Sequence, residues 1–209
     1  DGFTHPSNWA SVWSDAVKAS YGIKEVAIQA KPDNKFYNVN GLSLDGSWSF
    51  TSKNLDDVNE VDGDGNARLD ADGNQIVIKG LKSQWIAKTK QTANSLLAPT
   101  DWQVIAKAER NRAIDSDVAT YRAAVIAKCA AIEKSITDIT ETAIPSDLAT
   151  IKAKEEEDKT DADRKVVSDY EAEVAAKFAT FKALFDAPVD SDGRPTGNPP
   201  IHDWPVMGE

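Results

Sequence analysis

The sequence predicts an α+β protein in which a small, turn-rich β region precedes long antiparallel α-helices and an extended C-terminal arm. Short alternating runs separated by Asp-Gly turns occupy residues 1–80. Apolar residues recur every three or four positions across residues 81–186, and proline and glycine dominate residues 187–209. We therefore expect a small, mainly β docking domain, a helical hairpin or bundle, and an arm without a core of its own.

The first part is expected to contain one helix and several short strands. Apolar spacing between Trp9 and Val17 predicts a helix that Ser7 caps and Gly22 ends. Asp-Gly pairs such as Asp45-Gly46 predict tight hairpin turns between strands. The strands are expected over residues 25–29, 35–39, 42–44, 47–51, 67–69 and 75–79.

The second part is expected to begin with a helix over residues 81–97, which Pro99 interrupts. Thr100 or Asp101 is positioned to cap the next helix, and residues 113–116 break it. A longer helix is expected from Ser116, because apolar residues then follow one narrow stripe. The stripe consists of Val118, Tyr121, Val125, Cys129, Ile132, Ile136 and Ile139.

Residues 144–186 predict a second long helix, with Pro145 in its first turn. The charged stretch 152–165 leaves two interpretations open: one solvated helix, or two helices separated near residues 158–161. The C-terminal half carries Phe178, Phe181 and Phe185 on one stripe. A stripe this narrow cannot enclose a core alone, so we expect it to need a partner surface.

Composition excludes several classes of function. The chain has 209 residues and a net charge of -10, which would repel a nucleic acid. It has no apolar run of about 18 residues that would predict a membrane span. A single cysteine, Cys129, and two distant histidines, His5 and His202, offer no zinc or disulfide pattern. We expect no cofactor, no resident metal and no small-molecule substrate.

The acidic segments 62–66 and 70–74 are near-copies that leave two interpretations open. Alternating oxygen side chains suit Ca²⁺, but the spacing does not match a calcium-binding EF-hand loop, and β-turns explain the same residues. Carboxylates from residue 56 to residue 72 are opposed only by Arg68, which gives a local charge of -6. We favour turns and keep a cation-dependent binding module as an alternative.

Most tryptophans are expected to anchor the core, as is Cys129, whose thiol lies on the apolar stripe. These tryptophans are Trp9, Trp13, Trp48, Trp85 and Trp102. Trp204 differs because it lies in the proline-rich arm. It either docks back on the helices of its own chain or anchors the arm to a partner.

Residues 94–126 resemble a segment of tailed-bacteriophage proteins. Asn94-Ser95-Leu96-Leu97-Ala98-Pro99-Thr100-Asp101-Trp102 is similar to the pattern N-x-L-L-x-x-T-D-W, and Tyr121-Arg122-Ala123-Ala124-Val125 is similar to Y-R-x-A-V. The ending Ile201-His202-Asp203-Trp204-Pro205 resembles the D-W-P endings of some of these chains. The resemblance covers about a fifth of the chain and points to tail-fibre, baseplate and tail assembly proteins.

The resemblance implies a non-enzymatic structural component of the virion tail that contacts other tail proteins and copies of itself. The alternative is a tail or tail-fibre assembly chaperone that is absent from the mature virion. Within the motif, Tyr121 is expected to pack inward, and Arg122 to pair with Asp101 or Glu109. The candidate interaction residues are Asp101, Trp102, Tyr121, Arg122, Phe178, Phe181, Phe185 and Trp204.

Overall fold

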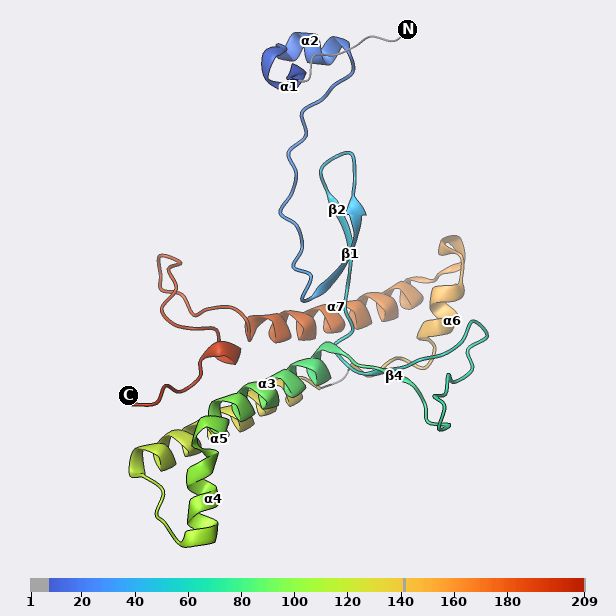
Figure 1. Cartoon of the computed structure of the whole chain (residues 1–209). Coiled ribbons are helices and arrows are strands. Elements are labelled where there is room, and N and C mark those ends of the chain that lie inside the picture. Colours follow the sequence, from blue (N-terminus) through green and yellow to red (C-terminus); the bar gives the residue numbers. More distant parts are fainter. Residues whose placement is uncertain (1–7, 141, 209) are drawn as a thin grey trace. The chain divides into compact units, whose positions relative to one another are not determined.

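Short strands precede long helices along the chain, which confirms the predicted α+β class (Figure 1). This computed structural model describes residues 8–140 and 142–208. Its contacts divide the chain into two units, Asp1–Lys53 and Asn54–Glu209. The region predicted over residues 1–80 therefore contributes to both units, and its last 27 residues belong with the helices.

Residues 8–53 of the first unit form two short helices and one hairpin. The single helix expected between Trp9 and Val17 is broken at Trp13, whose backbone is extended, with φ −85° and ψ 137°. It breaks there because Ser14 caps a new helix by accepting a hydrogen bond from the Val17 N–H. Gly22 ends this helix with φ 73°, whereas Ser7 lies outside the described residues. The elements are α1 (Trp9–Val12), α2 (Asp15–Ser20), β1 (Tyr37–Leu42) and β2 (Trp48–Ser52).

β1 and β2 form the expected hairpin, with Leu42 opposite Trp48 and Gly46 in the turn at φ 84°. The strand predicted over residues 25–29 does not form. Gln29 instead donates its N–H to the Gly46 carbonyl (2.9 Å), and its own carbonyl accepts the indole N–H of Trp48 (2.9 Å). Because Gln29 meets the hairpin at its turn, this segment adds no third strand to the ladder.

The second unit is built on the antiparallel pair α3 (Leu81–Leu97) and α5 (Ser116–Thr137). Their opposite directions follow from the contacts, because Lys82 reaches the Ile139 carbonyl and Tyr121 reaches the Leu96 carbonyl. The shorter elements are β3 (Val58–Asn59), β4 (Val77–Ile78), η1 (Ala98–Thr100), α4 (Asp101–Arg110), α6 (Leu148–Ala153), η2 (Glu156–Asp158), α7 (Asp161–Ala183) and η3 (Pro200–His202).

The core of the second unit lies between the predicted stripes. α3 buries side chains at intervals of four residues, and α5 buries residues from the expected stripe. Phe181 of α7 is fully buried, and the ring of Phe185 lies 4.5 Å from that of Trp85. The buried residues of α3 and α5 are Leu81, Trp85, Thr89, Ala93, Val125, Ile132 and Ile136.

The segment predicted as one helix or two over residues 144–186 forms two. α7 begins at a capping box, in which the Thr160 hydroxyl accepts the Asp163 N–H and the Asp163 carboxylate accepts the Thr160 N–H. α6 packs against α7 and is joined to it by the ion pair of Lys152 with Glu171 (2.9 Å). The prediction for Pro145 is wrong, because α6 begins only at Leu148 and Pro145 precedes it.

Residues 54–80, which we call the hairpin lobe, precede α3 in the chain and form a three-way junction. The main chains of Glu60, Arg68 and Ile76 bond in a ring, with N–H to carbonyl distances of 2.8–3.0 Å. The side-chain amide of Gln75 lies at this junction and donates to the carbonyls of Glu60, Arg68 and Ile76. Of the strands expected over residues 67–69 and 75–79, only the ends next to the turn pair, through the Leu69–Gln75 bridge and the bond from the Ile76 N–H to the Arg68 carbonyl. The rest of the second strand, β4, pairs with β3.

The D-x-D-G turns within the lobe explain its acidic repeats. Asp62 Oδ1 accepts the N–H groups of Asp64 and Asn66, both at 2.9 Å, and Gly65 has φ 85°. Asp70 makes the same bonds eight residues later. A third copy at Asp190 closes the hairpin of the arm. The interpretation as turns is confirmed for these residues.

Candidate interaction site

The segment over residues 94–126 lies where α3, η1, α4 and α5 meet. Arg122 of α5 donates from one guanidinium nitrogen to the Leu97 carbonyl (2.9 Å) and to the Thr100 hydroxyl (2.7 Å). The same nitrogen lies 2.9 Å from the carboxylate of Asp101, so the predicted pair with Asp101 is present. The side chain of Arg122 is 16% exposed and that of Asp101 is 54% exposed. Arg122 thereby ties the end of α3 to the start of α4.

Thr100 precedes α4, as predicted, but does not cap it with its side chain. Its hydroxyl instead donates to the Leu97 carbonyl (2.8 Å) while it accepts from Arg122. Thr100 is buried, so these bonds satisfy a polar group that would be costly to leave unpaired. The threonine therefore fixes the corner between α3 and α4.

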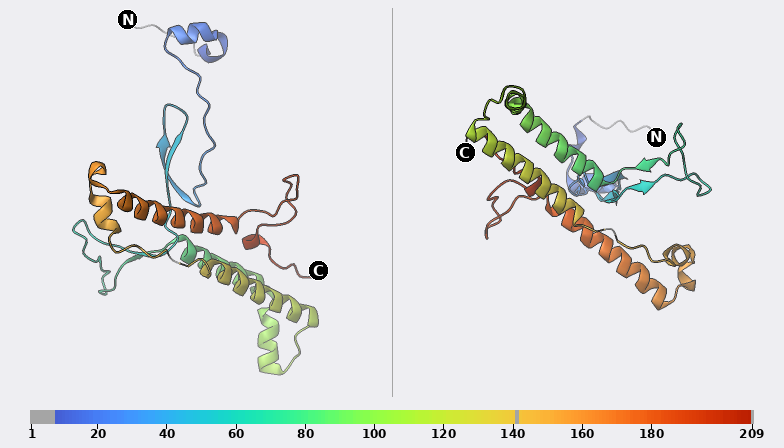
Figure 2. Two further views of the ribbon diagram at one scale, coloured as in Figure 1. Left: turned by 180° about the vertical axis from the view of Figure 1, so that it is seen from behind. Right: turned by 90° about the horizontal axis from the view of Figure 1, so that it is seen from below.

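A second contact fixes the inner face of α4. The amide of Gln103, a buried residue, donates to the Asp115 carboxylate (2.8 Å) and accepts the Asp115 N–H (2.9 Å). Asn111 ends the helix in the left-handed conformation, at φ 53°. Both ends of α4 are thus tied to the chain, while the helix turns away from the axis of α3 (Figures 1 and 2).

The outer face of α4 carries exposed apolar residues. Trp102 is 51% exposed and Ile105 is 55% exposed, and their spacing of three places them on neighbouring positions of the helix. Val104 adds a further exposed side chain. Trp102 is therefore not the core anchor that was expected. The guanidinium of Arg112 lies 5.3 Å from its ring centroid, so this tryptophan has a cationic neighbour.

Sequence reasoning included Trp102 among the candidates but missed Ile105, Val104 and Arg112. The only hint available in the sequence is the short length of this helix, which has ten residues in the structure. A short helix between a proline turn and a polar loop has little core to face. Its large apolar residues then remain at the surface.

The other aromatic candidates lie mainly inside the protein. Phe178 and Phe181 are buried, and Phe185 is half-buried against Trp85. Tyr121 is half-buried, with its hydroxyl 3.4 Å from the Leu96 carbonyl. These residues support the α3–α5–α7 core and leave the outer face of α4 as the principal exposed part of the candidate set.

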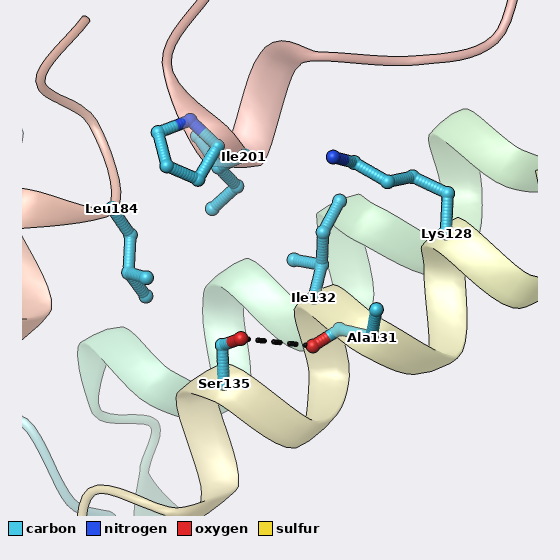
Figure 3. A pocket seen from close by; sticks show the side chains of 7 residues that line it. Lys128, Ala131, Ile132, Ser135, Leu184 and Ile201 are labelled. Atoms are coloured by element: carbon cyan, nitrogen blue, oxygen red, sulfur yellow. Dashed lines mark hydrogen bonds between the residues drawn. The ribbon is translucent and has the colours of Figure 1, made fainter. Parts of the chain in front are cut away.

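The arm docks back on the helices of its own chain. Ile201 is buried over α5, its N–H donates to the Leu184 carbonyl (3.1 Å), and Asp203 pairs with Lys128 (3.1 Å). Figure 3 shows Ile201 above Ile132 with Leu184 to one side, and these three residues line a pocket of about 80 Å³. The arm then continues along the first turns of α5, and Trp204 is half-buried. Of the two interpretations of Trp204, this arrangement agrees with docking on its own chain.

Cys129 and His202 are the remaining titratable candidates among the described residues. Burial and the nearby Glu133 carboxylate raise the pKa of the Cys129 thiol to about 11, which keeps it protonated near neutral pH. His202 lies beside the rings of Trp85 and Phe185, whereas His5 is outside the described residues.

The acidic turns use their carboxylates to bind the main chain. Backbone hydrogen bonds, chiefly from Asn66 and Asn74, lower the pKa values of Asp62 and Asp70. Across residues 8–140 and 142–208, no group of three or more His, Cys, Asp or Glu side chains is placed to hold a metal ion. The cation-dependent alternative therefore gains no geometric support from the described part of the lobe.

Comparisons with known proteins found no matching family model, no similar curated protein and no similar solved structure. Among the residues with described positions, no helix has both the length and the apolar character needed to cross a membrane.

Proposed function

We propose that this protein is a non-enzymatic structural component of a bacteriophage tail, such as a baseplate, fibre or fibre-adaptor subunit. It acts in the virion through contacts with other tail proteins and with copies of itself. The motif that resembles tail proteins supports this role, because its residues build the corner that presents α4. Arg122, Thr100 and Asp101 are the motif members that hold this corner.

The observation that carries the proposal is the exposure of Trp102 on a helix whose position is fixed. Burying a large apolar side chain against a partner is worth roughly 1.5–3 kcal/mol. Tryptophan is also enriched among the residues that dominate binding energy at interfaces. Because α4 is tied at Arg122 and at Gln103, less conformational entropy is lost when a partner covers it.

The N-terminal half of α7 supports the same role. Its stripe is buried at Phe178 and Phe181, but Val174 is 37% exposed and Val167 and Tyr170 are half-buried. The N-terminal half of α7 therefore offers further apolar surface to a neighbour. This is the behaviour expected of a helix that completes its packing within an assembly.

Quantitative mass spectrometry of purified particles tests the proposal, using a phage whose genome encodes this chain. We expect the chain in a fixed ratio to the known tail proteins of the particle. Its presence in infected cells together with its absence from the particle would contradict the structural role and favour the assembly chaperone. Intact particles made without the chain would contradict both roles.

A further inference from the structure

Two exposed apolar surfaces, one flanked by acidic and the other by basic residues, lie at the two ends of α3. The hairpin lobe precedes the first residue of α3, and α4 follows its last residue through η1 (Figures 1 and 2). α3 has 17 residues, so it separates the two surfaces by roughly 25 Å at 1.5 Å per residue. One copy of the second unit therefore cannot bring its own lobe onto its own α4 without losing this helix.

The lobe combines negative charge with exposed apolar side chains. Residues 54–80 contain seven acidic residues against Arg68 and Lys79, a net charge of -5. Three of the acidic residues are paired with basic ones, since Asp56 binds Lys82, Asp57 binds Lys79 and Glu60 binds Arg68. Asp62, Asp64, Asp70 and Asp72 remain at the tips. The exposed apolar residues are Val58 (41%), Val61 (52%), Leu69 (56%), Val77 (37%) and Ile78 (53%).

The other end of α3 has the complementary character. We call residues 101–112 the α4 tip. Beside Trp102 and Ile105, its last turn and the following loop carry Lys107, Arg110 and Arg112 against Glu109. With Asp101, which pairs with Arg122, the net charge of the α4 tip is +1 in a chain whose net charge is -10. The chain therefore offers an apolar surface with basic neighbours at one end of α3 and an apolar surface with acidic neighbours at the other.

We propose that the α4 tip of one copy docks on the hairpin lobe of a second copy. Trp102 and Ile105 would cover the exposed valines and leucine of the lobe, and Lys107 and Arg110 would face the aspartates at its tips. The two surfaces differ, so the contact is head-to-tail, and repeating it either closes a ring, of which a reciprocal pair is the smallest, or extends a filament. This inference extends the self-association included in the proposed function.

Charge reversal tests the docking with two variants. Asp64→Lys with Asp72→Lys changes the net charge of the lobe from -5 to -1 and spares Asp62 and Asp70, which hold the turns. Lys107→Glu with Arg110→Glu makes the α4 tip acidic and leaves Arg112 over Trp102. Lys134→Glu with Lys165→Glu is the matched control for the tip, because it makes the same change in net charge at exposed sites on α5 and α7.

Sedimentation velocity at low salt measures the assembly, with circular dichroism to verify that each variant is folded. We expect the wild type and the control to associate as concentration rises, and association to weaken at about 1 M salt, where the screening length is about 3 Å. Each reversed variant alone should stay monomeric. An equal mixture of the two should associate again, since the unchanged α4 tip of the lobe variant can bind the unchanged lobe of the tip variant.

A wild type that is monomeric at every concentration tested would overturn the inference. So would a mixture that stays monomeric while its folded components match the wild type in helix content. Association that survives reversal of the lobe but is lost in Trp102→Ala would show that α4 pairs with another α4, which also overturns it. These outcomes are independent of whether the chain is found in the particle, which tests the proposed function.

Discussion

Replacing Arg122 with methionine tests how the corner between α3 and α4 is held. Methionine keeps most of the volume of arginine but cannot donate to the Leu97 carbonyl or to the buried Thr100 hydroxyl. Hydrogen bonds from a charged group contribute about 1.5–3 kcal/mol, whereas an ion pair with a half-exposed partner such as Asp101 contributes about 0–1 kcal/mol. We therefore expect Arg122→Met to lower the free energy of unfolding by about 2 kcal/mol.

Urea unfolding followed by circular dichroism measures this loss, and amide hydrogen exchange shows where it falls. The amides of α4 and η1 should exchange faster than those of α7. Arg164→Met is the matched control, because Arg164 forms ion pairs at an exposed site on α7 and its loss should cost about 0–1 kcal/mol. A loss below about 0.5 kcal/mol in Arg122→Met, with unchanged exchange in α4, would refute the role assigned to this arginine.

Three further predictions concern other parts of the chain. Gly46→Ala should destabilise the β1–β2 hairpin more than Gly73→Ala destabilises the lobe. Both glycines have φ 84°, but only at Gly46 would an added Cβ collide with a neighbour, the Ala27 carbonyl. Nuclear magnetic resonance of each hairpin measures the two effects, and equal effects would contradict the prediction. Because the pKa of Cys129 is about 11, its thiol should react with a thiol reagent at pH 8 at least about 100-fold more slowly than a free cysteine. Glu133→Gln should speed this reaction. A wild-type rate as fast as that of free cysteine, unchanged in Glu133→Gln, would contradict the assigned burial. Hydrogen bonds from Lys154 and Thr160 lower the pKa of Asp163 from 3.8 to about 2, so its carboxylate should stabilise the start of α7 fully above about pH 4 and lose this effect as the pH falls through about 2. Hydrogen exchange in the first turn of α7, compared with that of Asp163→Asn, checks this, and loss of protection already at pH 5 would contradict it.

The helical part of the fold was predictable because its signals are local. Periodic apolar residues identified α3 and α5, and the charged stretch before Asp161 indicated the break before α7. Asp and Gly spacing identified the turns at Asp62 and Asp70 for steric reasons that apply to any chain. The same spacing at Asp190 also predicts a turn, but the surrounding prolines led us to expect only an extended arm there.

The three-way junction of the lobe could not be predicted in this way. Its ring of bonds joins the main chains of Glu60, Arg68 and Ile76, and main-chain groups are the same in every residue. Only the eight-residue spacing of the turns hints that the segments between them meet. The docking of Ile201 escaped prediction for a related reason, because a proline-rich arm gives no periodic signal for the one residue that it buries.

The candidate site was predictable in its supports and not in its exposed face. The motif identified Asp101 and Arg122, whose pairing follows from opposite charges. Whether Trp102 points into a core depends on what surrounds α4 in space, and the sequence alone carries no information on that packing. The aromatic stripe from Phe178 to Phe185 differs in the other direction. These residues were expected to need a partner protein, but they pack within their own chain, against Trp85 and the α3–α5 pair.

Site-specific photo-crosslinking during phage assembly tests the central claim most directly, namely that the outer face of α4 binds another protein. A benzophenone amino acid replaces Trp102 in one variant and Lys165, an exposed residue on α7, in a control. After irradiation of purified particles, position 102 is predicted to give a covalent adduct with a tail protein or a second copy, and position 165 much less. Equal yields at the two positions, or no adduct from position 102 in particles that contain the chain, would contradict the account.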